Sequence, residues 1–119
     1  MKNLFNVVLA LALFALGSQA FAQTSDTFID GEQLYKYCTS TKLAENNTCA
    51  GYIGGVLDTM TTLAGSDVIK KLICIPVNVK LSTIRDVLVS YLKKHPEELG
   101  LNASSLILDP LVEAYPCSP

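Results

Sequence analysis

Four cysteines, Cys38, Cys49, Cys74 and Cys117, are the residues most able to carry chemistry in this chain. A zinc knuckle or a thiol-redox centre uses cysteines in a C-x-x-C pair, but the successive spacings here are 11, 25 and 43 residues. An even number of cysteines in an oxidising compartment is typical of disulfides. We therefore expect two intrachain disulfides, no metal site and no cofactor.

The segment His95-Pro96-Glu97-Glu98 holds the only histidine and two adjacent carboxylates. A single histidine at a helix end is usually a capping or solvated residue. Glu97 and Glu98 could be paired carboxylates for acid–base work, but the charged start of a helix is the simpler interpretation. No Ser/His/Asp or Cys/His arrangement and no phosphate-binding glycine loop is visible. We therefore predict no catalytic and no cofactor-binding residues, and a protein that is not an enzyme.

The first 22 residues have the pattern of a cleavable export signal. Lys2 precedes an apolar run from Leu4 to Leu16, and Ala20-Phe21-Ala22 matches the small-x-small pattern before a cleavage site. The run is too short to span a bilayer. We expect residues 1–22 to be a signal peptide and residues 23–119 to be one exported domain in the periplasm, with no membrane attachment after cleavage.

The charge balance argues against nucleic acid as a partner. The full chain has a net charge of −2, and loss of Lys2 with the signal peptide makes the exported part −3. Binding to a phosphate backbone requires a basic face, and none is visible.

These residues must be positioned by helices, and the central one is predicted to run from Cys49 to Met60 and on to about Ala64. Asn46, Asn47 and Thr48 are candidate N-caps, and Gly65 is the candidate C-cap. Apolar residues recur at helical spacing: Ile53, Val56, Leu57, Met60, Leu63 and Ala64. Gly51, Gly54 and Gly55 each lower helix stability by about 1 kcal/mol relative to alanine. Either this side packs tightly inside the domain's own core, or it forms a dimer contact.

Shorter elements surround this helix. Residues 30–38 predict a first helix capped by Asp30, and residues 68–72 a further short turn capped by Ser66 and Asp67. Residues 73–76 should be extended through the core, because the residue before Pro76 is disfavoured in a helix. The next helix should span Lys80–His95, starting near Asn78 or Val79. The last should be capped by Asn102 and either kinked or split at Pro110.

The helix spacing favours one disulfide pairing. Cys38 and Cys49 both point toward the core across a short hairpin, so we expect a Cys38–Cys49 bond, with Cys74–Cys117 by elimination, although four cysteines allow three connectivities. Long stretches of alternating polar and apolar residues are lacking. The predicted fold class is therefore all-α, a compact bundle of four or five helices with two intrachain disulfides.

Several motifs in this order resemble the Rap/Tai family of type VI secretion amidase-immunity proteins. They are Gly31-x-x-Leu34-Tyr-x-Tyr37-Cys38, Cys49-x-Gly51-Tyr52-Ile53-x-Gly55-Val56-x-Asp58, Cys74-Ile-Pro76, Tyr91-Leu92-x-x-His95-Pro96-Glu97 and Ala114-Tyr-Pro116-Cys117. The match covers nearly all of the exported part. The resemblance implies a small helical protein, often a homodimer, that binds and blocks a peptidoglycan amidase effector in the periplasm.

We therefore expect a protein partner, a secreted peptidoglycan amidase, and occlusion of its cleft by a helix–loop surface. The candidate contacts are Ser66, Asp67, Lys70 and Lys71. Two alternatives from other classes remain, a periplasmic acid-stress chaperone and an envelope adaptor protein. Eleven acidic residues and one histidine give little support to an acid-triggered chaperone.

Overall fold

The computed structural model describes residues 28–117, which form four α-helices and one turn of 3-10 helix. In chain order they are α2 (Gly31–Thr39), α3 (Leu43–Gly65), α4 (Leu81–Lys94), η1 (Pro96–Glu98) and α5 (Ala103–Ala114). Across residues 28–117 there is no β-strand, only two isolated bridges, Asp30 with Asn102 and Ile73 with Pro116. The all-α prediction is confirmed. The predicted signal peptide and its cleavage point lie outside the described residues.

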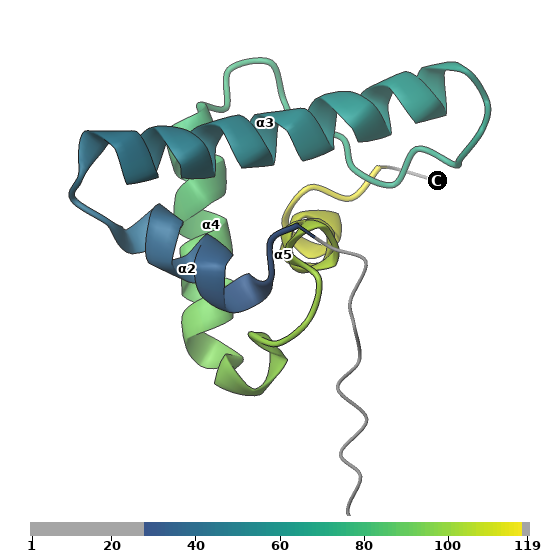
Figure 1. The fold of residues 1–119 in the computed structure, drawn as a ribbon. Helices are drawn as coiled ribbons and strands as arrows, with labels where there is room; N and C mark the ends of the chain where they lie inside the picture. Colours follow the sequence, from purple (N-terminus) through teal and green to yellow (C-terminus); the bar gives the residue numbers. More distant parts are fainter. Residues whose placement is uncertain (1–27, 118–119) are drawn as a thin grey trace, which may run out of the picture.

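The helices form two crossed pairs around one core. The α3 helix lies across one end of the molecule with α2 alongside, while α4 crosses behind them and packs against α5 (Figure 1). All four α-helices contribute fully buried side chains. These core residues are Leu34, Cys38, Cys49, Ile53, Ile84, Leu88, Leu92, Ala103, Leu106, Ile107 and Leu111.

The first turn of α2 is fixed by a cap and by close backbone packing. The Asp30 carboxylate accepts a hydrogen bond from the Gln33 amide at 2.8 Å, as the sequence predicts. Gly31 lies against the segment before α5, where a Cβ atom would collide with Leu106 Cδ1 and lie 2.8 Å from the Leu99 carbonyl oxygen. The absence of a side chain at Gly31 therefore allows α2 to pack directly on this segment.

The α3 helix begins at Leu43, six residues earlier than the sequence suggested, so the predicted start at Cys49 was wrong. The three candidate caps, Asn46, Asn47 and Thr48, lie inside the helix, and Lys42 is the N-cap residue. The polar run was taken for a loop because it lacks apolar periodicity. A helix on the surface needs no apolar residue on its exposed side, and here these residues form a solvated face of the first turns.

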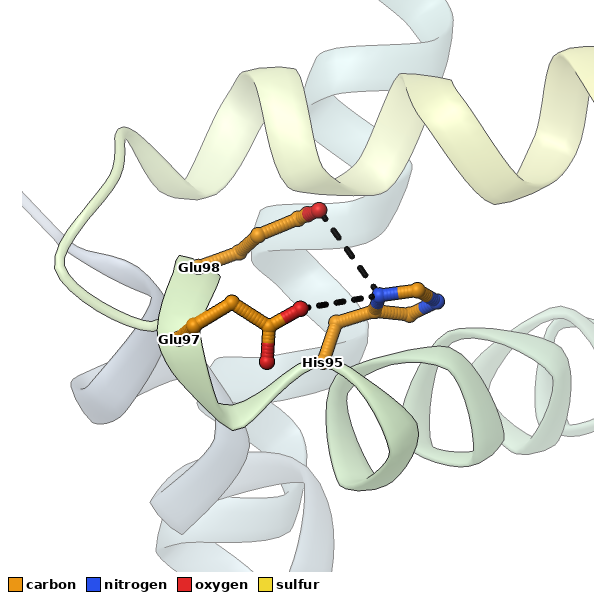
Figure 2. A group of neighbouring side chains, drawn as sticks. All are labelled: His95, Glu97 and Glu98. Atoms are coloured by element: carbon orange, nitrogen blue, oxygen red, sulfur yellow. Dashed lines mark hydrogen bonds and ion pairs between the residues drawn. The ribbon is translucent and has the colours of Figure 1, made fainter.

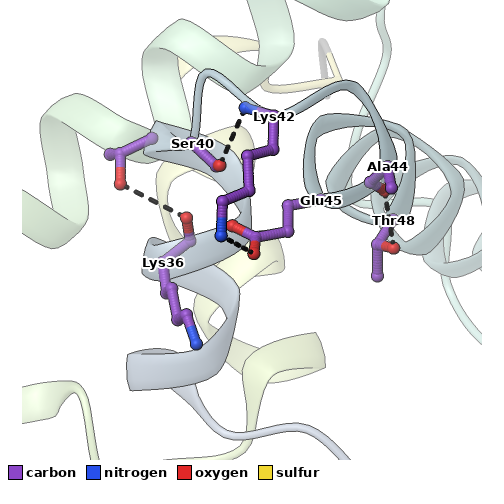
Figure 3. Close-up of polar contacts among 7 residues, drawn as sticks. Lys36, Ser40, Lys42, Ala44, Glu45 and Thr48 are labelled. Carbon is purple, nitrogen blue, oxygen red and sulfur yellow. Dashed lines mark hydrogen bonds and ion pairs between the residues drawn. The ribbon is translucent and has the colours of Figure 1, made fainter.

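Polar contacts bridge the connection between α2 and α3 (Figure 3). The Lys42 amide donates to Ser40 Oγ at 3.1 Å, and Lys42 Nζ pairs with Glu45 Oε1 at 3.3 Å. Hydrogen bonds from Ser40 and Lys42 lower the pKa of the Glu45 carboxyl. A carboxylate in the first turn also suits the helix dipole. Within the first turns, Thr48 Oγ1 donates to the Ala44 carbonyl at 3.0 Å.

The C-terminal end of α3 is closed by Asp67 rather than by glycine. Asp67 has a φ of 56°, and no described glycine has a positive φ. The Val68 amide donates to the Leu63 carbonyl at 3.0 Å and the Asp67 amide to the Ala64 carbonyl at 3.3 Å. This is the Schellman pattern, with aspartate in the left-handed position that glycine usually takes. The predicted glycine cap was therefore wrong, and Gly65 is the last residue of the helix.

The connection between α3 and α4 is irregular, so the predicted short helical turn at residues 68–72 was wrong. Residues 73–75 are not helical: Ile73 forms an isolated bridge with Pro116, and the Cys74 amide donates to the Tyr115 carbonyl at 2.8 Å. This segment runs along the surface rather than through the core, because Cys74 is exposed and its two isoleucine neighbours are only half-buried.

The last two helices agree closely with the sequence pattern. Leu81–Lys94 lies inside the predicted range for α4, and Ile84, Leu88 and Leu92 form its buried face. The Asn102 side chain caps α5 by accepting from the Ser104 amide at 2.8 Å. The α5 helix continues through the buried Pro110 as one element, which excludes the predicted split into two helices.

Both predicted disulfides are present. Cys38 bonds Cys49 with a Cα–Cα distance of 5.0 Å, and Cys74 bonds Cys117 with a Cα–Cα distance of 4.9 Å. The first bond is buried and joins α2 to α3. The second ties the segment before α4 to the segment that follows α5.

Candidate partner-binding surface

The second half of α3 is far less buried than the first. Its fully buried side chains are Cys49 and Ile53, and every later residue of the helix is exposed or half-buried. In Figure 1 this half extends past α4 before the chain turns back toward the C-terminus. The helix therefore presents a long exposed arm, although the sequence predicted a broad apolar face packed in the core.

The connection that follows this arm is held at its C-terminal end. Besides the Cys74–Cys117 disulfide, Ile73 bridges Pro116 and the Cys117 amide donates to the Leu72 carbonyl at 3.4 Å. The Schellman closure at Asp67 fixes its other end. We call residues 66–72 the tip segment. It is a surface segment with two fixed ends, which limits the conformations it can adopt.

A cleft of about 230 Å³ lies between the exposed arm of α3 and the connection. Leu57, Met60 and Ala64 line it from the helix side. Of the four contact residues predicted from the sequence, Lys70 and Lys71 line this cleft, while Ser66 and Asp67 lie at the end of the helix. All four are exposed. Neither lysine pairs with a carboxylate among the described residues.

Sequence reasoning missed two apolar residues of the tip segment. Val68 has 66% of its surface exposed and Leu72 has 47%. They were assigned to a short helical turn, whose apolar side would have been buried. The neighbouring Gly65, Ser66 and Asp67 favour a loop, in which these two side chains stay exposed and available to a partner.

A second, more apolar cleft of about 420 Å³ lies between α3 and α5. Gly51, Tyr52, Gly55 and Val56 line one side, and Leu108 lies on the other. Burial raises the pKa of the Tyr52 hydroxyl. No contact within this chain requires glycine at these three positions of α3. A Cβ atom at Gly51, Gly54 or Gly55 would meet no atom within 4 Å. The interpretation that they pack inside the domain's own core was wrong.

The residues around η1 form a polar cluster at another corner of the molecule (Figure 2). His95 Nδ1 lies 3.3 Å from Glu97 Oε1 and 3.7 Å from Glu98 Oε1. The Tyr91 hydroxyl donates to Glu98 Oε2 at 2.7 Å, and its ring stacks on the imidazole with centroids 4.3 Å apart. The hydrogen bond to Glu98, with burial and nearby carboxylates, raises the pKa of Tyr91 to about 12.

Residues 30–117 match the family model of the Rap1a immunity proteins, which is most of the chain. The chain belongs to the Rap1a immunity protein family. The match spans all four helices and the four cysteines, and it agrees with the Rap/Tai resemblance seen in the motifs. No curated protein and no solved structure matches the chain.

Membership in this family implies that the chain binds a partner effector protein. Two disulfides fit an oxidising compartment outside the cytoplasm. Within residues 28–117, no helix combines the length and apolar character needed to cross a membrane.

Proposed function

We propose that this Rap1a-family chain is a periplasmic immunity protein that binds and occludes a type VI secretion peptidoglycan amidase effector. The main support is the family match across residues 30–117. The proposed action is binding without catalysis. All four cysteines, the strongest nucleophiles in the sequence, form disulfides. A disulfide-bonded sulfur is not a thiolate and cannot attack a substrate.

The proposed contact is the tip segment together with the exposed arm of α3. An inhibitor that covers a hydrolase cleft needs a protruding surface that loses little conformational entropy on binding. The tip segment meets this need because it is closed at Asp67 and tied at Cys74, yet its side chains are exposed. The effector would lose access to the peptide stem of the cell wall because the tip segment fills its cleft.

The chemistry of the tip segment suits a protein partner. Val68 and Leu72 supply exposed apolar surface near the two ends of the segment, and burial of such side chains is worth about 25 cal/mol per Å². Lys70 and Lys71 supply unpaired positive charge in a chain whose net charge is −2. Such a local positive patch would speed association with an acidic rim.

Coexpression tests this function directly. Cells that export a peptidoglycan amidase encoded beside this chain should lyse, and coexpression of the chain should restore growth. In vitro, release of soluble fragments from purified cell wall should stop at one equivalent of the chain. A neighbouring amidase that is neither bound nor inhibited would contradict the proposal.

A charge-reversal pair locates the surface. The double variant Lys70→Glu/Lys71→Glu should weaken binding of the amidase at least tenfold. The matched control is Lys93→Glu/Lys94→Glu, which makes the same charge change on α4 and should bind normally. Equal losses in both variants would indicate long-range electrostatics rather than contact at the tip segment. Suppression of client aggregation at low pH without amidase binding would favour the chaperone alternative.

We also propose that the outer face of α3 mediates homodimer formation. Gly51 and Gly55 leave the helix backbone bare beside an apolar cleft, which permits close approach of a second helix. Asp58 is the only charged residue of α3 after Glu45, so two copies can meet here with little like-charge repulsion.

Light scattering tests the homodimer: it should give twice the chain mass for the wild type, and Gly55→Phe should give a folded monomer. A monomeric wild-type protein at high micromolar concentration would contradict this part of the proposal.

A further inference from the structure

We propose that His95, Glu97 and Glu98 form a Zn²⁺ site on the corner of the molecule at η1. Each side chain offers one ligand atom, and the three ligand atoms all lie within 4.8 Å of one another. The proposal does not rest on the immunity function. The expectation of no metal site was based on the cysteine spacing alone, and the ligands proposed here include no cysteine.

The spacing of the ligand atoms suits a shared metal ion. In a tetrahedral zinc site with bonds of 2.0–2.1 Å, neighbouring ligand atoms lie about 3.3 Å apart. His95 Nδ1 lies 3.3 Å from Glu97 Oε1 and 3.7 Å from Glu98 Oε1. The ligand atoms of Glu97 and Glu98 lie within 4.8 Å of each other, and the Glu97 side chain, which is 67% exposed, can rotate to shorten this distance. Figure 2 shows both carboxylates directed at the same nitrogen.

A proton on His95 accounts for the positions of the two carboxylates less well than a shared metal ion does. A single Nδ1–H group can donate to Glu97, but at 3.7 Å the second carboxylate oxygen is too distant for a hydrogen bond. One imidazolium also leaves two carboxylates with a net negative charge. Lys93 and Lys94 do not compensate, since neither pairs with Glu97 or Glu98 among the described residues. A divalent cation would contact all three groups and balance the charge.

Tyr91 holds two of the three ligands in place. Its hydroxyl donates to Glu98 Oε2 at 2.7 Å, which leaves Oε1 facing the imidazole. Its ring stacks on His95 at an interplanar angle of 30°. Outer partners of this kind orient metal ligands and often carry a tenfold or larger share of metal affinity. Because Tyr91 lies one turn before His95 on α4, the backbone fixes this support.

The ligand set indicates zinc rather than magnesium or calcium. Imidazole nitrogen suits zinc and its transition-metal neighbours, whereas magnesium and calcium prefer oxygen ligands alone. Three protein ligands leave a fourth position for water.

The single histidine makes the site easy to observe. The oxidised chain, without an affinity tag and freed of metal with chelator, is titrated with zinc chloride. Calorimetry should give one site per chain, and the His95 ring proton resonances should shift in step. Magnesium chloride should give neither signal.

Variants separate this site from adventitious binding. His95→Ala should lower zinc affinity at least tenfold, and Glu97→Gln should lower it severalfold with the fold unchanged by circular dichroism. Tyr91→Phe, which loses the hydroxyl that orients Glu98, should also weaken zinc binding, by about tenfold. The control Glu32→Gln, another exposed carboxylate in a first helical turn, should bind zinc like the wild type. Zinc binding that survives in His95→Ala, or unmoved His95 resonances at 100 µM zinc (about a hundred times a micromolar Kd), would overturn the proposal.

Discussion

Gly31 occupies a position where the molecule has no room for a side chain. The backbone of residue 99 and the side chain of Leu106 both lie against it, and a backbone carbonyl cannot rotate away as a side chain can. Gly31→Ala should therefore lower the free energy of unfolding by about 1–3 kcal/mol, the usual cost of overpacking. Urea denaturation followed by circular dichroism measures this, and an unchanged midpoint would contradict the close packing.

At Gly55, substitution by alanine is expected to raise the stability of the protein rather than lower it. A methyl group there meets open space, and alanine is a better helix former by about 1 kcal/mol. Gly55→Ala should therefore raise the urea midpoint of the isolated chain at low concentration. A lower midpoint at low concentration would contradict the open space beside Gly55, whereas a midpoint that falls only at high concentration would indicate a second molecule against this glycine.

Tyr91 should lose its proton later than an ordinary tyrosine. Its folded pKa of about 12 lies above the usual value near 10, because the neutral hydroxyl donates to Glu98. A raised pKa means that the stability from this contact is complete below pH 10 and is lost as the pH rises through about 12. The phenolate absorbance of the wild type minus that of Tyr91→Phe gives the transition. Glu98→Gln should move it toward the ordinary value.

Helix ends could be predicted from the sequence where a short polar side chain acts as the cap. Asp30 and Asn102 have this role because their oxygens reach the free amides of the first turn. The start of α3 could not be predicted in this way. Lys42 makes no side-chain cap, and the polar residues after it resemble a loop until the Cys38–Cys49 bond and α2 are known to lie beside them.

The two disulfides should differ in both their contribution to stability and their accessibility. In the chain-entropy model, cross-links that span 11 and 43 residues are worth about 3 and about 4 kcal/mol. Removing Cys74 and Cys117 as an Ala pair should therefore lower the Tm more than removing Cys38 and Cys49 as an Ala pair, since alanine adds no buried hydroxyl at either site. Since Cys74 is exposed and Cys49 is fully buried, mild reductant should open the Cys74–Cys117 bond first. Mass spectrometry after thiol alkylation gives the order, and simultaneous opening would contradict it.

At the scale of the whole molecule, the sequence could not predict which parts of α3 are exposed or where the clefts lie. The apolar spacing of α3 predicted a buried helix, but its fully buried side chains end at Ile53, and no local pattern indicates where the cover from neighbouring helices ends. The same holds for the four predicted contact residues. Their exposure could be anticipated from their charge and loop setting, whereas the cleft beside Lys70 and Lys71 depends on how the connection folds back on α3.

Partial reduction tests whether the fixed tip segment matters for binding. Opening only the Cys74–Cys117 bond frees the C-terminal end of the connection while the buried Cys38–Cys49 bond still holds α2 to α3. The folded, half-reduced chain should bind its effector partner more weakly than the oxidised chain, because the tip segment then loses more conformational entropy on binding. Calorimetry on the two forms measures the difference. Equal affinities would mean that the contact lies elsewhere.

Both disulfides join cysteines that are consecutive along the chain, Cys38 with Cys49 and then Cys74 with Cys117. A chain that crosses a membrane from its N-terminus presents its thiols in that same order. An oxidising enzyme that simply couples each newly emerged thiol to the previous free one would therefore make the native pairs at the first attempt. Export should need an oxidase but no isomerase, and the yield of protein should be unchanged in cells that lack disulfide shuffling.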